Sequence, residues 1–228
     1  RRPPSGVKAW GQLHLKWLNT VTFDQPAQRA TMLDYKAEVE HALERIGRLE
    51  QAIDEAIKDA PEKMKAVIEA LQALRGVAKL TAATIVAEVG ELSRFEHPKK
   101  LMGYSGTVSS EHSTGGSRRQ GSITKTGNAH LRRVVIEAAW SYQHQPHVAA
   151  TLRKRQEGLS PTVKEIAWKA QQRLHRRFKR LSITKVHPKA ITAVGRELLG
   201  FIWAIGVEVE RGFPQTERTK CPTAAPVT

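Results

Sequence analysis

The sequence has almost no cysteine. Its 228 residues include one, Cys221, in a polar stretch near the C-terminus. A single cysteine can build neither an internal disulfide framework nor a cysteine-ligated metal site. We therefore expect a protein of the reducing cytoplasm whose fold depends on packing.

Long apolar runs are also lacking. The most apolar stretch, Leu198–Val209, falls short of the roughly 20 residues that cross a bilayer, and Glu197, Glu208 and Glu210 flank or enter it. No membrane partner is expected. The N-terminus has no apolar core behind its charges, so no secretory signal is expected. The first methionine is Met32, which suggests that the sequence begins inside a longer polypeptide.

Acidic residues are scarce relative to basic ones. Lys and Arg total 37 against 22 Asp and Glu, which gives a formal net charge of +15 and a pI near 10.2. Such an excess attracts polyanions, and the attraction weakens as salt rises. Every aspartate lies in or beside the N-terminal helices, and the glutamates are scattered. Because two-metal chemistry needs clustered carboxylates, we expect no metal and no other cofactor in this chain.

No alternation of apolar and polar residues long enough to predict a β-strand is present. A nucleotide-binding glycine loop and an internal repeat are missing as well. The sequence thus predicts a mainly α fold. We expect an N-terminal helical, coiled-coil-like region over residues 1–60. A helical domain over residues 61–212 and a disordered tail over residues 213–228 complete the predicted organisation.

What the chain does contain begins with a heptad pattern between Met32 and Ala56. Val39, Ile46 and Ile53 take the a positions and Leu49 a d position, a choice that favours two-stranded pairing. The pattern predicts either self-association into a homo-oligomer through the a and d positions or an intramolecular helical hairpin in which the same positions are buried. About four heptads do not distinguish the two.

A glycine turn between two helical segments follows. Pro61 ends the first pattern, a second helix is expected over residues 62–74, and the segment from Leu74 to Ala83 reads as helix, turn at Gly76, helix. This resembles a helix-hairpin-helix element, which offers backbone N–H groups to phosphate. Such elements usually carry a second glycine where this chain has Ala78, so a plain helical turn is the alternative.

Residues 103–122 are rich in Gly, Ser and Thr and predict a long loop. The loop runs into a helix with Asn128 or Thr126 as N-cap and with Leu131, Val134, Val135, Ala138, Ala139 and Tyr142 on its buried face. No acid lies between Glu111 and Glu137. We predict that this segment binds phosphate through its cations and its helix start, namely Arg118, Arg119, Lys125, Asn128, Arg132 and Arg133.

Two long amphipathic helices complete the predicted domain. The first, over residues 162–181, buries Val163, Ile166, Ala170, Leu174 and Phe178, and its far side carries a row of cations, Lys169, Arg173, Arg176 and Arg180. Like charges so placed repel one another, and a bound polyanion relieves that cost. The alternative is that these cations form a solvent-exposed basic face that binds no ligand. The second helix, over residues 189–211, turns Ile191, Val194, Leu198, Ile202, Ile205 and Val209 inward.

Four short runs stand out between residues 110 and 140. They are Ser-Glu-His-Ser-Thr-Gly-Gly from Ser110 to Gly116, the run from Arg118 to Asn128, Leu131-Arg132-Arg133 and Ala138-Ala139-Trp140. These runs resemble the C-terminal domain of the IS-one-ten family of insertion-sequence transposases, also called bridge-RNA-guided recombinases. The resemblance extends over most of the chain after about residue 60. The preceding helices look like the family's central coiled-coil region.

The resemblance implies DNA and a guide RNA as partners. It also implies a RuvC-like nuclease half, which would hold the Mg²⁺, outside this chain. The family's nucleophilic serine falls at Thr114, with Ser113 beside it, so these two are the candidate catalytic residues. Threonine keeps the hydroxyl but adds a methyl group that hinders attack on phosphorus. The alternative is that both hydroxyls only bond to the local backbone.

Three functions are compatible with these patterns. The leading one is the DNA- and RNA-engaging half of a transposase that exchanges DNA strands only together with a nuclease half. The second is a non-catalytic helix-hairpin-helix nucleic-acid-binding module from a truncated element. The third is a coiled-coil oligomerisation scaffold whose basic charge is incidental.

Overall fold

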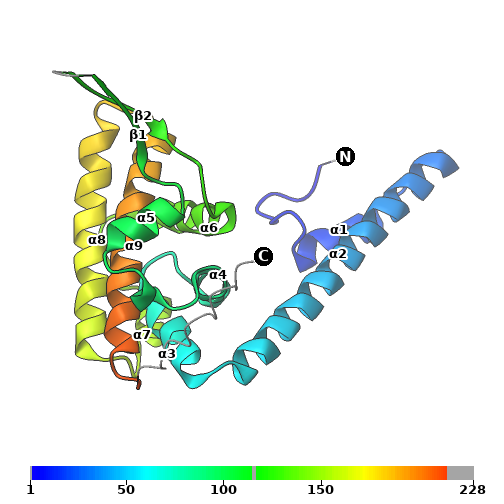
Figure 1. The fold of residues 1–228 in the computed structure, drawn as a ribbon. Helices are drawn as coiled ribbons and strands as arrows, with labels where there is room; N and C mark the ends of the chain where they lie inside the picture. Colours follow the sequence, from blue (N-terminus) through cyan, green and yellow to red (C-terminus); the bar gives the residue numbers. More distant parts are fainter. Residues whose placement is uncertain (1, 115–116, 215–228) are drawn as a thin grey trace, which may run out of the picture. The chain divides into compact units, whose positions relative to one another are not determined.

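A computed structural model of the protein describes residues 2–114 and 117–214, which are mainly helical with one two-stranded hairpin (Figure 1). This confirms the predicted mainly α fold class. The elements in chain order are α1 Gln12–Thr20, α2 Pro26–Asp59, α3 Glu62–Leu71, α4 Lys79–Val89, η1 Leu92–Arg94, α5 Pro98–Tyr104, β1 Ser109–Thr114, β2 Ser117–Ile123, α6 Ala129–Ala139, η2 Trp140–Gln143, α7 Ala150–Gln156, α8 Pro161–Ser182 and α9 His187–Glu210.

The chain forms two compact units, Arg1–Ala56 and Ile57–Thr228. The division falls inside α2, slightly before the boundary expected from Pro61. Helix α2 itself runs to Asp59, which agrees with the rule that a helix rarely continues into a residue that precedes proline. The two units are described separately.

The N-terminal unit consists of α1 and most of α2. Helix α2 spans 34 residues, and none of its side chains is buried. Ile46 and Leu49 of the heptad pattern are 51% and 53% exposed. The heptad positions therefore form an apolar face of α2 that is about half exposed within this unit. Its pairing with a second copy and its burial in an intramolecular helical hairpin both stay predictions.

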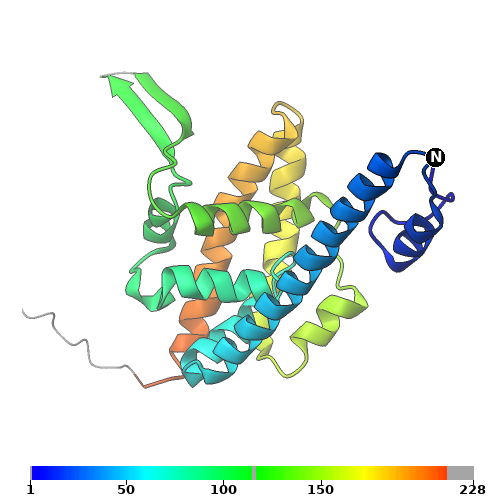
Figure 2. The same cartoon turned by 90° about the vertical axis from the view of Figure 1, so that its right-hand side faces the viewer.

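Helix α9 forms the centre of the second unit, where it packs against α3, α5, α6 and α8 (Figures 1 and 2). Its inward face is the one that helical spacing predicted: Ile191, Val194, Leu198, Ile202 and Ile205 are fully buried, and Val209 is partly buried. Burial of about 25 cal/mol per Å² of apolar surface makes such a face the main source of stability.

Helix α9 as a whole is long and apolar enough to cross a membrane, although its most apolar run is short. Of the apolar window that meets this criterion, 50% is buried inside the unit. A core helix of a globular fold gives the same signal, so this is weak evidence for a membrane span.

Helix α8 lies beside α9 with its apolar side inward. Val163, Ala170, Leu174 and Phe178 are buried as predicted, whereas Ile166 is only partly buried. Ser160 caps the helix, since its side chain accepts a hydrogen bond from the Val163 amide. The orientation of α8 is thereby fixed by packing, which turns its charged side outward.

The prediction of a long loop over residues 103–122 is wrong for most of that segment. Strands β1 and β2 pair antiparallel, with Ser109 opposite Ile123 and Thr114 opposite Ser117. The residues of both strands are almost all polar, so no alternation of apolar and polar residues marks them in the sequence. The hairpin projects from the end of the unit where the α8–α9 connection lies (Figures 1 and 2).

A buried carboxylate ties the end of α9 to the middle of the chain. Glu210 is 2% exposed, and its two oxygens each accept a backbone N–H at 2.7 Å, from Leu92 and Ser93. These amides begin η1, where N–H groups have no partner within the helix. The sequence showed Glu210 only as a charge at the edge of an apolar run, because its partners lie more than a hundred residues away.

Candidate nucleic-acid interface

The hairpin carries four of the predicted site residues. Its backbone register sets Ser113 opposite Arg118, Thr114 opposite Ser117 and His112 opposite Arg119. The predicted catalytic hydroxyls and the first two predicted phosphate contacts therefore belong to one ribbon, at the end away from its base. The side chains of residues 112–120 lie outside the described part of the structure.

The base of the hairpin is clamped between the ends of α5 and α6. The Thr124 amide donates to Val108 O at 2.9 Å and the Lys125 amide to Gly106 O at 3.0 Å. Gly106 has φ +67°, and a Cβ there would overlap the Thr126 carbonyl, so this close approach of two backbones requires glycine.

Lys125 lies in the same clamp. Its φ of +58° is uncommon for a residue with a side chain and is held by the surrounding backbone hydrogen bonds. Its side chain is exposed, as a phosphate contact requires.

Asn128 and Arg132 are occupied with the fold. Asn128 is the N-cap of α6, as predicted: its Oδ1 accepts from the Leu131 amide at 2.8 Å. Its Nδ2 donates to Glu88 Oε2 at 2.6 Å. Arg132 donates through Nη1 to Ser105 O at 2.8 Å and is partly buried. These bonds give both residues a structural role in holding α6 and the base of the hairpin together. Their predicted contact with nucleic acid stays a prediction.

Arg133 points away from the buried face of α6, as its spacing predicted. It forms an ion pair with Glu137 at 3.1 Å, and both side chains are 61% exposed. Ion pairs so exposed contribute little to stability. Arg133 can therefore exchange Glu137 for a phosphate at small cost.

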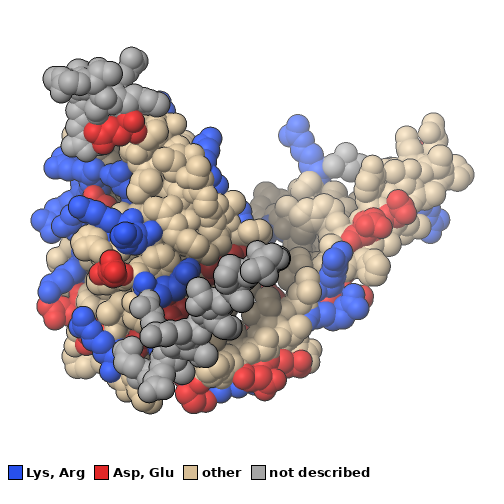
Figure 3. Space-filling view, in the orientation of Figure 1, with Lys and Arg blue, Asp and Glu red and all other residues tan. Residues whose placement is uncertain are grey.

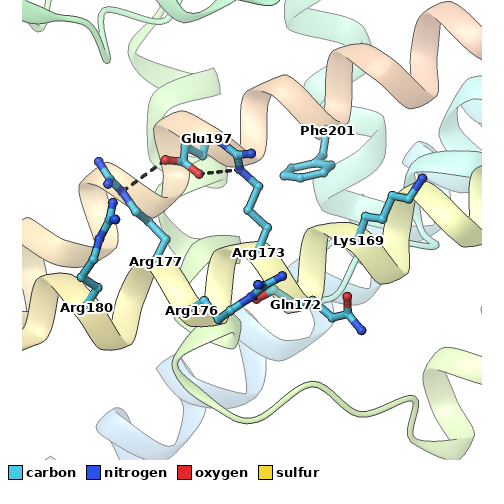
Figure 4. A pocket seen from close by; sticks show the side chains of 8 residues that line it. All are labelled: Lys169, Gln172, Arg173, Arg176, Arg177, Arg180, Glu197 and Phe201. Carbon is cyan, nitrogen blue, oxygen red and sulfur yellow. Dashed lines mark hydrogen bonds and ion pairs between the residues drawn. The ribbon is translucent and has the colours of Figure 1, made fainter.

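The four predicted cations of α8 lie along one edge of a groove of about 750 Å³ between α8 and α9 (Figure 4). They occupy successive turns and extend over about 16 Å, at 1.5 Å of rise per residue. In the space-filling view Lys and Arg side chains gather over the α8 side of the second unit, at the left of Figure 3. The residues that line the groove are Lys169, Gln172, Arg173, Arg176, Arg177, Arg180, Glu197 and Phe201.

Four of these lining residues were not among the predicted site residues, namely Gln172, Arg177, Glu197 and Phe201. Arg177 follows Arg173 by one turn, and the carboxylate of Glu197 on α9 lies between them. Arg173 Nε donates to Glu197 Oε2 at 3.2 Å, and Arg177 Nε forms an ion pair with Oε1 at 3.2 Å. Phe201 lies one turn further along α9. Only the packing of α8 on α9 brings these residues together, and no local pattern could have revealed it.

The groove has four positive charges in excess, because five cations and one carboxylate line it. Lys169 also pairs with Glu165 at 2.6 Å on the outer side of α8, and this hydrogen bond with its charge lowers the pKa of Glu165. Within the described residues Arg180 has no acidic partner, and Arg176 reaches only the Gln172 carbonyl. An anion in the groove would therefore meet guanidinium donors that are free to bind it.

The segment around Gly76 has the predicted local form of two helices, α3 and α4, joined by a turn. The glycine in that turn has φ +81°. The turn packs into the unit, because a Cβ on Gly76 would overlap the Ala138 carbonyl. Arg155 donates to Val77 O at 2.6 Å, and burial lowers the pKa of that guanidinium. These contacts give the turn a structural role, and phosphate binding by it stays a prediction.

Among the described residues, no group of three or more His, Cys, Asp or Glu side chains could hold a metal ion.

Comparisons with known proteins agree with the resemblance. Residues 68–153 match the family model described as Transposase IS116/IS110/IS902 family. The chain is 39% identical over 207 residues to the putative transposase y4qE of Sinorhizobium fredii (strain NBRC 101917 / NGR234), covering 90% of this chain and 49% of that protein. It is 28% identical over 176 residues to the transposase for insertion sequence element IS1533 of Leptospira borgpetersenii, covering 77% and 50%.

A shorter match, 37% identical over 92 residues, is to the transposase for insertion sequence element IS1111A of Coxiella burnetii, with 38% of this chain and 25% of that protein covered. Residues 68–153 are thus similar to this transposase family, and proteins named as transposases are among those that match the chain. It spans about half the length of the first two relatives. The matched segment includes the hairpin and α6, whereas α8 and α9 lie beyond it.

The bonds of Asn128 predict that its replacement destabilises the protein. Asn128→Ala removes an N-cap and leaves Glu88 without its donor, so we expect a loss of about 2–3 kcal/mol in the free energy of unfolding. Urea unfolding followed by circular dichroism measures it. Arg133→Ala, five residues along the same helix, is the matched control and should change stability by less than about 0.5 kcal/mol. Equal stabilities of the two variants would contradict the structural role of Asn128.

Proposed function

We propose that this chain is the nucleic-acid-engaging C-terminal half of an insertion-sequence transposase. The observation that carries the proposal is the α8–α9 groove, where five cations line one cavity against a single acid. The family match over residues 68–153 and the transposase relatives support the same conclusion.

The cations of the groove suit a phosphate backbone. The apolar face of α8 is buried, so the helix cannot rotate to separate its charges. Each phosphate that binds releases counterions and relieves this repulsion. Because arginine forks hydrogen-bond phosphate oxygens in a fixed geometry, the groove would position a nucleic-acid strand without reading its bases. Recognition of the target DNA sequence would then depend on another component, which agrees with a guide RNA as the second partner.

Strand exchange would need a second half that carries the metal-binding carboxylates and Mg²⁺, since the described residues offer no metal site. In this proposal the present chain alone binds nucleic acid in the cytoplasm but leaves its phosphodiester bonds intact. The apolar face of α2, with Ile46 and Leu49 half exposed, supports pairing of two copies through a coiled coil.

For the chemistry itself we propose Thr114 as the nucleophile, with Ser113 as the neighbouring candidate. The hydroxyl oxygen would attack phosphorus, the strand's bridging oxygen would leave with the proton, and a phosphoester to the protein would form. Attack by the hydroxyl end of another strand would reverse these steps. The backbone register supports the proposal to the extent that both hydroxyl residues share a ribbon with Arg118 and Arg119.

The groove predicts how binding depends on salt. Replacing Arg176 and Arg180 together by alanine should weaken binding of the chain to DNA. It should also reduce the slope of log K against log salt by roughly 0.9 for each lost phosphate contact. Titrations by fluorescence anisotropy at several salt concentrations measure the slope. The two side chains are exposed, so the fold should be unaffected.

The matched control removes two exposed cations elsewhere on the same unit. The double variant Arg153→Ala and Lys154→Ala on α7 lowers the net charge by the same amount and should leave the slope nearly unchanged. If both double variants lower affinity and slope equally, only overall charge matters, and the groove is not the binding site.

The hairpin predicts a hydroxyl-dependent reaction in the transposase that carries both halves. Thr114→Ala should reduce strand transfer by more than about a thousandfold while DNA binding is retained. Thr114→Ser should keep or raise the rate, because it removes the hindering methyl group. Ser113→Ala is the control and should stay active. A covalent DNA adduct that persists in Thr114→Ala, or is lost only in Ser113→Ala, would refute the assignment.

A further inference from the structure

The α8–α9 groove has an aromatic wall as well as charge. Phe201 of α9 lines it and lies between Arg173 and Lys169 in the close view (Figure 4). The ring packs against the hydrophobic core on one side and is only partly buried. The exposed part of the ring gives the groove an apolar surface that a phosphate group does not use.

The arginines of the groove are held in place before any ligand binds. Glu197 is 20% exposed and engages both Arg173 and Arg177 through their Nε atoms. This leaves the outer guanidinium nitrogens of both residues free of Glu197 and able to bind another acceptor. The carboxylate therefore orients two phosphate-binding groups, Arg173 on the side of Phe201 and Arg177 on the opposite side, and offsets their mutual repulsion (Figure 4).

The shape of the groove favours one strand over two. A groove of about 750 Å³ accommodates a base and the adjoining backbone, whereas a double helix lying across it would present only its phosphates. In a duplex the faces of the bases are stacked on one another and cannot reach a ring in a groove wall. In a single strand each base has a face available, and stacking on an aromatic side chain is sequence-tolerant.

We propose that this groove binds a single-stranded segment of nucleic acid, with one base stacked on Phe201 and the adjoining phosphates along Arg173, Arg176 and Arg180. The inference rests on the proposed function and adds to it the strandedness of the ligand. Gln172, the neutral polar residue of the lining, can donate to or accept from the edge of any unpaired base, so it would add a contact without selecting a sequence.

The test separates the base from the backbone. The affinity of the full chain is measured for a short oligothymidine and for an abasic strand of the same length, with the wild type and with Phe201→Leu, which keeps an apolar side chain against the core. The wild type should prefer the thymidine strand by about tenfold, and Phe201→Leu should lose most of that preference. Binding to a blunt duplex should not change. Uridine and abasic ribose strands repeat the comparison for RNA.

Two controls keep the outcome unambiguous. Trp140→Ala removes an exposed aromatic side chain that lies outside the groove and should keep the tenfold preference. Arg176→Ala with Arg180→Ala should weaken binding to thymidine and abasic strands alike. A preference that depends on Phe201 with deoxyribose, with ribose or with both supports the inference and identifies the strand.

The inference is overturned if Phe201→Leu keeps the wild-type preference in both series, or if the variant weakens duplex binding as much as single-strand binding. These results leave the proposed function intact as long as the arginine variant still weakens binding. If the arginine variant binds every ligand as the wild type does, the groove itself is not the interface and the proposed function loses its main support.

Discussion

The packing of α8 against α9 is the interaction on which the candidate interface depends. Leu174 and Phe178 of α8 are buried with Leu198 of α9, so the rotation of α8 is fixed by its core face. Lys169, Arg173, Arg176 and Arg180 are thereby held on one side, although like charges repel along a helix. Apolar burial is worth more than this surface repulsion, which is of the order of a few tenths of a kcal/mol per pair. The fold can therefore maintain a charge density that an isolated helix would not.

Helix α9 connects the two places where nucleic acid is proposed to bind. Glu197 orients Arg173 and Arg177 in the groove, and its neighbour Arg196 donates to Ser109 Oγ at 3.3 Å at the base of the hairpin. Two adjacent residues of one buried helix thus reach the groove and the start of β1. A strand held in the groove and a phosphate near the hairpin would be positioned by the same rigid element.

The sequence predicted what depends on local spacing. Helical periodicity identified the buried faces of α6, α8 and α9 and the outward row of α8, because a helix repeats every 3.6 residues whatever surrounds it. The cap of α6 was narrowed to Asn128 or Thr126 because both residue types cap helices and both lie just before the predicted helix, and the structure has Asn128. The hairpin was missed because the residues of its strands are almost all polar and show no alternation of apolar and polar side chains. Glu197, Phe201 and Glu210 could not be placed, since their partners are distant in sequence and are known only once α9 is packed. The structural bonds of Asn128 and Arg132 could not be predicted either, because composition does not reveal which polar groups the fold itself requires.

The central claim is that a nucleic-acid strand lies between α8 and α9, and crosslinking tests it most directly. The full chain is irradiated with an oligonucleotide that carries photoreactive thiopyrimidines, and the crosslinked peptides are identified by mass spectrometry. The account predicts that they come from residues 161–182 and 187–210. Crosslinks confined to α2 or α7, with none in these two helices, would contradict it.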